Sequence, residues 1–143
     1  MNRREIVLAA LALAGSDGYT PVQIQKLLFL VDKRISTAIG GPYFNFRPYD
    51  YGPFDQRVYQ EIEQLSREGL AEVAYSPATR LRRYAVTQPG AILGQAALDG
   101  VDPRVRAYLK ALSDWVRSLP FSSLVSSIYA EYPEMKANSV FNQ

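Results

Sequence analysis

Acid–base or nucleophilic chemistry in this chain would have to use Asp, Glu, Lys or Tyr, because its 143 residues include no histidine and no cysteine. This composition excludes Ser-His and Cys-His nucleophiles, thiolate chemistry and most zinc sites. Two pairs of acidic residues are poorly spaced for joint acid–base work. Glu61 and Glu63 diverge on a helix, and Glu131 and Glu134 are separated by a proline. We therefore expect no catalytic residue, no metal site and no cofactor.

The densest group of side chains that could bind another molecule is aromatic. Residues 42–54 read PYFNFRPYDYGPF and hold six aromatic rings in thirteen residues. Their prolines exclude a regular helix, so we expect a fixed, extended or turned connection, called the aromatic connection below. Tyrosine joins an apolar ring to a hydroxyl that needs a polar partner, which favours a contact surface. The predicted partner-binding residues are Tyr43, Phe46, Tyr49, Asp50 and Tyr51.

Two purely structural roles are the alternatives for this segment. The rings could pack the aromatic connection against the first two helices, because a long loop needs buried anchors of its own. Asp50, which has a tyrosine on either side, could simply shape a turn by accepting a hydrogen bond from a backbone amide.

A second candidate surface is basic. Arg80, Arg82 and Arg83 fall within four residues, in a predicted hairpin, where they could contact nucleic-acid phosphates. The helix predicted before that hairpin is acidic, since residues 53–70 carry two arginines against four acidic side chains. A recognition helix with a net negative charge would be repelled by the DNA phosphates. We therefore expect nucleic-acid binding to be weak, and the alternative is that the arginines blunt an exposed strand edge.

The elements that must position these residues can be read from apolar periodicity and turn residues. Thr20, Pro21 and Gln23 form a capping box with a first-turn proline, which predicts the start of a helix. Two β-prone runs, 71–75 and 81–86, are separated by turn residues and predict an antiparallel hairpin. The predicted helices are about 2–14, 20–40, 53–68, 89–98, 103–119 and 122–131, and the tail to residue 143 is expected to be loop.

Three helices followed by a hairpin is the element order of a winged helix. We predict an α+β fold and one domain over residues 1–143. Within it, residues 1–90 would form a winged-helix-like core of three helices and a hairpin wing, and residues 91–143 a helical C-terminal extension.

The first fourteen residues leave one question of targeting. Arg3 and Arg4 precede an apolar run, as in an export signal, but Glu5 interrupts the basic start and the run is short. No run approaches the roughly 18 apolar residues of a membrane span. We therefore expect a cytoplasmic protein without a membrane partner, and export is the alternative.

Several short motifs resemble those of a group of bacterial winged-helix-like proteins. The matching segments are QKLLFL at 25–30, FRPYDYGPF at 46–54, residues 65–70, and YAVT at 84–87 with Gly90. They are similar to a KLL helix, a YGP turn, a GL helix end and a wing exit of the form Y-x-V/L-T-x-x-G. The group includes YwgA-like proteins and, more distantly, the Panacea (SocA-like) antitoxin domain. The resemblance covers about residues 20–90 and implies a small regulatory or partner-neutralising domain without catalytic residues.

These observations together favour a non-enzymatic bacterial regulatory module that binds a protein partner, such as a toxin or a defence component. The alternative function is a winged-helix DNA-binding transcriptional regulator. The acidic third helix favours the first function, since it would repel DNA phosphates. Whether the protein forms a homodimer is left open.

Overall fold

A computed structural model describes residues 1–78 and 80–141, and over these residues the fold is α+β, as predicted. Two antiparallel hairpins accompany seven α-helices in the described part of the chain. The helices are α1 (Arg3–Ala14), α2 (Pro21–Arg34), α3 (Ser36–Ile39), α4 (Gln56–Arg67), α5 (Gln88–Asp99), α6 (Pro103–Ser118) and α7 (Phe121–Glu131). The strands are β1 (Arg47–Tyr49), β2 (Gly52–Phe54), β3 (Ala71–Ser76) and β4 (Leu81–Val86), and short 3₁₀ turns cover η1 (Gly15–Asp17) and η2 (Pro133–Lys136).

Helix α2 lies at the centre of the fold, and every residue from 24 to 31 is buried. It begins as predicted, because Thr20 and Gln23 exchange backbone-to-side-chain hydrogen bonds of 2.9 and 3.4 Å. The predicted end near Gly40 was wrong: the helix stops at Arg34, and the chain turns at Ile35 into the short α3. The break is confined to Ile35, whose φ of −135° and ψ of 19° are not helical, and the chain is helical again from Ser36.

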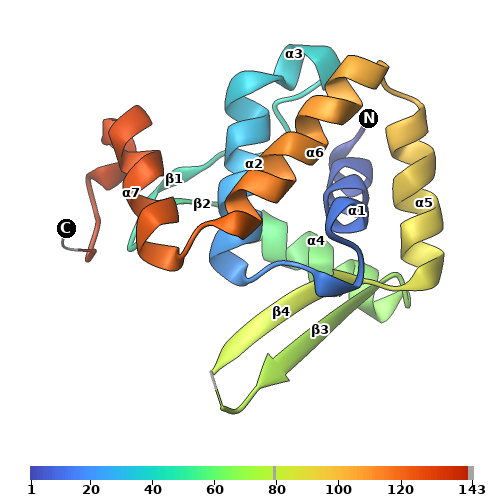
Figure 1. Cartoon of the computed structure of the whole chain (residues 1–143), viewed down its shortest axis with the longest axis horizontal. Coiled ribbons are helices and arrows are strands. Elements are labelled where there is room, and N and C mark those ends of the chain that lie inside the picture. The colour runs from blue at the N-terminus through green and yellow to red at the C-terminus, as the bar shows by residue number, and fades with distance from the viewer. Residues whose placement is uncertain (79, 142–143) are drawn as a thin grey trace.

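One buried cluster joins the elements before and after residue 90. Figure 1 shows α6 lying across α1 and α2, with α5 beside α1. The cluster includes Leu8 of α1, Leu28 of α2, Ile62 of α4, Leu109 of α6 and Ile128 of α7. None of the helices described here combines the length and the apolar character needed to cross a membrane.

The hairpin predicted for residues 71–86 is confirmed, with Ala71 paired to Val86 and Ser76 to Leu81. It projects from the helices (Figure 1), and Tyr19 anchors its base. The backbones of Tyr19 and Tyr84 exchange two hydrogen bonds of 2.8 Å.

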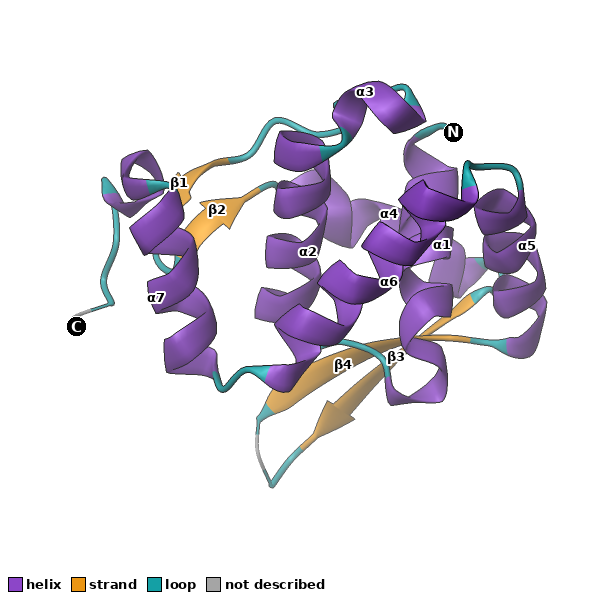
Figure 2. Cartoon of the chain, turned by 45° about the horizontal axis from the view of Figure 1, so that its top comes forward, coloured by secondary structure: helices purple, strands orange, loops and turns teal. Residues whose placement is uncertain are grey.

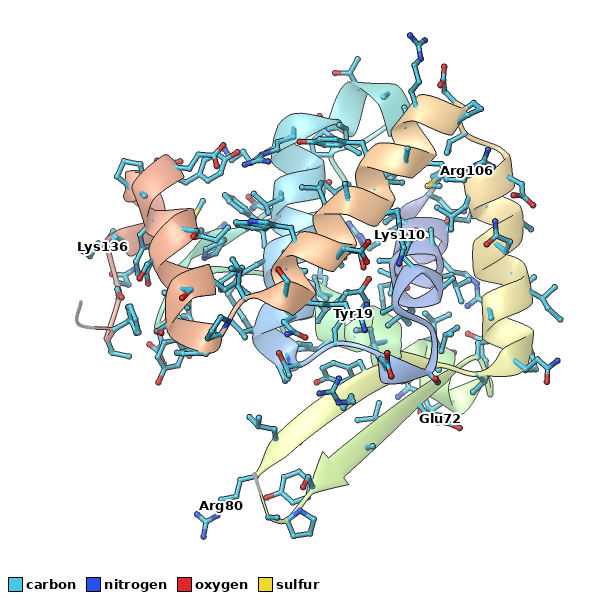
Figure 3. The ribbon with its side chains drawn as sticks, viewed as in Figure 1. Tyr19, Glu72, Arg80, Arg106, Lys110 and Lys136 are labelled. Atoms are coloured by element: carbon cyan, nitrogen blue, oxygen red, sulfur yellow. The ribbon has the colours of Figure 1, made fainter. Side chains whose placement is uncertain are left out.

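Buried Tyr19 also ties the hairpin to two helices through its side chain. The Tyr19 hydroxyl donates to the Ala10 carbonyl of α1 at 2.6 Å and accepts from the Ser113 hydroxyl of α6 at 2.6 Å. Figure 3 shows the side chain in the middle of the molecule. The β3–β4 hairpin is therefore held rigidly against α1 and α6 at its base.

The aromatic connection contains a second hairpin that the sequence did not predict. Strands β1 and β2 pair antiparallel, with Pro48 opposite Pro53. The predicted start of the third helix at Pro53 was therefore wrong: α4 begins at Gln56, and Phe54 lies on a strand. Asp55 sets this start, because its carboxylate accepts the Arg57 N–H at 2.9 Å as an N-cap.

The tail, predicted as loop, contains the η2 turn and buries Met135. Beyond η2, the Asn138 side chain donates to the Pro48 carbonyl at 3.2 Å, and the Val140 N–H donates to the Asp50 carbonyl at 2.9 Å. The tail therefore holds the β1–β2 hairpin from its outer side.

Close packing of α5 on α1 depends on a glycine. A Cβ at Gly94 would lie 2.4 Å from the Leu8 carbonyl oxygen and 2.7 Å from the Ala12 Cβ. We expect Gly94→Ala to lower the free energy of unfolding by about 2 kcal/mol, despite the better helix propensity of Ala, because backbone of α1 must shift. Urea denaturation measures this change.

Gly100→Ala is the matched control, because its nearest contact would be an ordinary 3.5 Å. Its stability should stay close to that of the wild type. If Gly94→Ala proved equally stable, the close α1–α5 packing would be contradicted.

Candidate functional site

The predicted partner-binding aromatics divide into two groups. Tyr43 and Phe46 are partly buried against the core, and the Phe46 ring meets Phe29 edge-on at 5.6 Å. Tyr49 and Tyr51 remain 53% and 45% exposed. Tyr43 and Phe46 therefore anchor the aromatic connection, as the core alternative supposed, and Tyr49 and Tyr51 are accessible to another molecule.

Two polar side chains of α2 fix the ends of the aromatic connection. At its start, the Asp32 carboxylate accepts the N–H groups of Tyr43 at 3.0 Å and Phe44 at 2.9 Å. Burial raises the pKa of Asp32, and these two amides oppose that shift. At its end, the Gln25 amide donates to the Asp55 carbonyl at 2.9 Å and accepts the Asp55 N–H at 3.0 Å. The exposed rings are thus carried on a fixed backbone.

An apolar groove of about 490 Å³ lies between the first turns of α2 and the β1–β2 hairpin. Figure 2 shows this hairpin and α7 together on one side of α2. The groove takes Val22 from α2, Tyr51 from the turn of the hairpin, Tyr59 from α4, Leu81 from β4 and Phe121 from α7. Ligand sites in proteins commonly have volumes of this size and mostly apolar walls.

Ring-to-ring contacts hold the groove walls in place. Tyr49 stacks on Phe54 with centroids 5.0 Å apart, and Phe54 meets Tyr59 at 5.7 Å. Among the other lining rings, Tyr51 meets Phe121 edge-on at 5.1 Å. Because these rings are already ordered, a molecule that binds them would cost little conformational entropy in the protein.

A lysine lies in the floor of this groove. Lys26 is only 3% exposed, and its Nζ donates to the Pro53 carbonyl at 3.3 Å, its one hydrogen bond within the described residues. Gly52 lies against it, since a Cβ there would be 3.6 Å from Nζ. Burial lowers the pKa of Lys26 to about 7. No Asp or Glu is among the described residues that line the groove.

Sequence reasoning missed Lys26, although the sequence held a signal for it. On a helix, Lys26 shares a face with Val22, Phe29 and Leu30, so a lysine stands where the pattern requires an apolar residue. Phe121 and Leu81 were missed for another reason. They are far apart in the sequence, and only the fold brings them to one groove.

The three arginines predicted to contact nucleic acid, Arg80, Arg82 and Arg83, do not form one patch. Arg80 lies at the tip of the β3–β4 hairpin and points away from the molecule (Figure 3). Arg82 and Arg83 are consecutive on β4, so their side chains point to opposite faces of the strand pair. Arg83 donates to the carbonyl of Asp17.

The predicted site residue Asp50 occupies the turn between β1 and β2, where its carbonyl accepts the hydrogen bond from the tail. Elsewhere in residues 1–78 and 80–141, no three His, Cys, Asp or Glu side chains gather where a metal ion could bind.

The buried amine of Lys26 predicts how stability depends on pH. Its pKa is about 7 when folded and ordinarily 10.5, so between these values the unfolded state binds one more proton. Stability should therefore rise with pH from 7 to 9, by up to about 1.4 kcal/mol per unit. The protonated amine destabilises the fold most below pH 7. Urea denaturation at several pH values measures this slope.

Lys26→Met should lose most of this slope, and Lys33→Met, which removes an exposed lysine of the same helix, should keep it. Equal slopes in the wild type and Lys26→Met would show that Lys26 is charged in the folded protein.

Comparisons of this chain with models of protein families, with curated proteins and with solved structures find no match. The resemblance to YwgA-like proteins and to the Panacea domain therefore stays a prediction.

Proposed function

We propose that this protein is a non-enzymatic regulatory module and that a segment of a partner protein docks in its apolar groove. The observation that carries this proposal is the exposure of large apolar side chains around one concavity. Tyr49, Tyr51, Leu81 and Phe121 are 45–53% exposed at the groove of about 490 Å³. Exposed apolar groups gathered around a hollow are typical of interaction sites.

The charges around the groove favour a partner segment that is apolar and acidic. Lys26 supplies the basic group of the floor, and no acidic side chain is among the described lining residues. Burial raises the pKa of the Tyr59 phenol to about 12, and Arg82 opposes that shift, so a second cation is close to this wall. Complementary charge is a common basis of partner selection.

The proposal includes the regulatory setting that the sequence predicts. The order α1, α2, α4 and then the β3–β4 hairpin supports a winged-helix-like core, although the short α3 and the β1–β2 hairpin lie between α2 and α4. The resemblance to antitoxin-like proteins supports a toxin or a defence component as the partner, in the bacterial cytoplasm.

Selection from a displayed library of random peptides tests the docking proposal without a known partner. We expect peptides with apolar residues and at least one acidic residue. Tyr51→Ala and Phe121→Ala should each weaken their binding by about 2 kcal/mol, or roughly thirtyfold, with little change in Tm, because both rings are about half exposed. Fluorescence anisotropy gives the affinities.

Tyr75→Ala is the control for this experiment, because it removes an exposed ring of the β3–β4 hairpin outside the groove lining. It should leave peptide affinity unchanged. Failure to select any peptide, or equal binding by the groove variants, would refute docking. A large fall in Tm for Tyr51→Ala would instead show that the Tyr51 ring stabilises the core.

A nucleic acid is the second candidate partner, favoured by a hairpin that extends from the molecule with Arg80 at its tip (Figure 3). We expect weak binding to a 20-base-pair duplex, with a slope of log K against log salt no steeper than about −3. Anisotropy at 50 and 200 mM salt measures it. The triple variant changes Arg80, Arg82 and Arg83 to Ala. If the wild type binds tightly at physiological salt and this variant does not, DNA becomes the favoured partner.

A further inference from the structure

We propose that Lys26 is the anion-binding residue of the groove, and that the docked segment places a carboxylate against its Nζ. This inference rests on the proposed function, because it names the chemistry of the segment that docks there. The carboxylate belongs either to an acidic side chain of the segment or to its C-terminus.

The first observation is that the amine has unused hydrogen-bonding capacity beside a cavity. A lysine ammonium carries three donors. Within the described residues, the Lys26 Nζ donates only to the Pro53 carbonyl, at 3.3 Å, and the side chain lines the groove. A buried cation without a counter-charge is costly, so an arriving carboxylate would relieve that cost.

The neighbouring residue of α2 shows how this fold satisfies a purely structural polar group. Gln25 is equally buried, and both ends of its amide are paired with the Asp55 backbone at 2.9 and 3.0 Å. Among residues 1–78 and 80–141, Lys26 has no such second partner. The residue of β2 that lies against its amine is Gly52, which adds no side chain over it. The amine therefore keeps donors without a partner among the described residues, at the wall of the groove.

Binding of a carboxylate should be coupled to protonation. Burial lowers the pKa of Lys26 to about 7, so about half of the free protein carries a neutral amine at that pH. A carboxylate favours the ammonium form, and docking then takes up a proton. The affinity of the protein for the carboxylate should therefore fall about fivefold between pH 7 and pH 8.

Other titratable groups near the groove should not produce this pH dependence. The titratable groups that line it besides Lys26 are Tyr49, Tyr51 and Tyr59. Nearby, Tyr129 lies against Gly52, Arg82 is close to Tyr59, and Asp55 follows the lining residue Phe54. Phenols ordinarily keep their proton up to pH 8. The Asp55 carboxylate accepts the N–H groups of Asn45 at 2.7 Å and Arg57 at 2.9 Å, so it is already engaged outside the groove.

A matched pair of small probes tests the role of Lys26 directly. In amide NMR titrations of the full chain, we expect 6-phenylhexanoate to bind at least tenfold more tightly than 6-phenylhexanamide at pH 6.5. Lys26→Met should abolish that preference and the fivefold pH effect, whereas Lys26→Arg should retain the preference. Lys33→Met is the control and should behave like the wild type. If wild-type affinities for both probes are equal, the inference is wrong, whether or not the variants fold.

Selected peptides distinguish failure of this inference from failure of docking. Each Glu or Asp of a bound peptide is changed to its amide, and separately the C-terminus is amidated. One of these changes should cost at least tenfold in affinity, and the affected group identifies the source of the carboxylate. Peptides that bind equally well after all of these changes would overturn the role of Lys26 and leave docking intact. If 6-phenylhexanoate binds and no peptide does, the groove is a site for small carboxylic acids. That result would overturn both the docking of a partner segment and the role of Lys26 in it.

Discussion

Burial of α2 on all sides is the constraint on which the rest of this structure depends. A helix enclosed from residue 24 to residue 31 must satisfy its own polar side chains inside the protein. Gln25 and Lys26 find their partners in the backbone at Asp55 and Pro53. The aromatic connection is therefore bound closely along α2, and the position of its exposed rings follows from the needs of two buried polar groups.

Local signals in the sequence predicted most elements of the fold. Thr20, Thr87 and Asp102 each cap a helix where the sequence placed one, because a cap depends only on neighbouring residues. The β1–β2 hairpin was missed because its strands have three residues each and hold a facing pair of prolines, Pro48 and Pro53. Proline opposes pairing within a strand, and here tertiary contacts with α2 and the tail overcome that preference.

The candidate site was predictable only in part. Tyr43 and Tyr51 lie in one segment of uniform composition, so nothing local distinguishes the core ring from the exposed one. Their difference comes from long-range contacts, because the Tyr43 hydroxyl reaches the Met1 carbonyl, whereas Tyr51 meets the half-exposed Phe121 of α7. Lys26 is the opposite case, since its place on an apolar helix face marks it in the sequence. The cavity that gives this lysine a role still requires contributions from Leu81 and Phe121.

The groove walls come from residues near positions 20, 50, 81 and 121, so no short fragment of the chain can form the groove. Its shape exists only after contacts of large sequence separation are complete. An occupant would therefore bind the fully folded protein and not its partly folded states. By linkage, it would slow hydrogen exchange across the whole core at once, because every opening that separates α2, β4 and α7 would first have to release it.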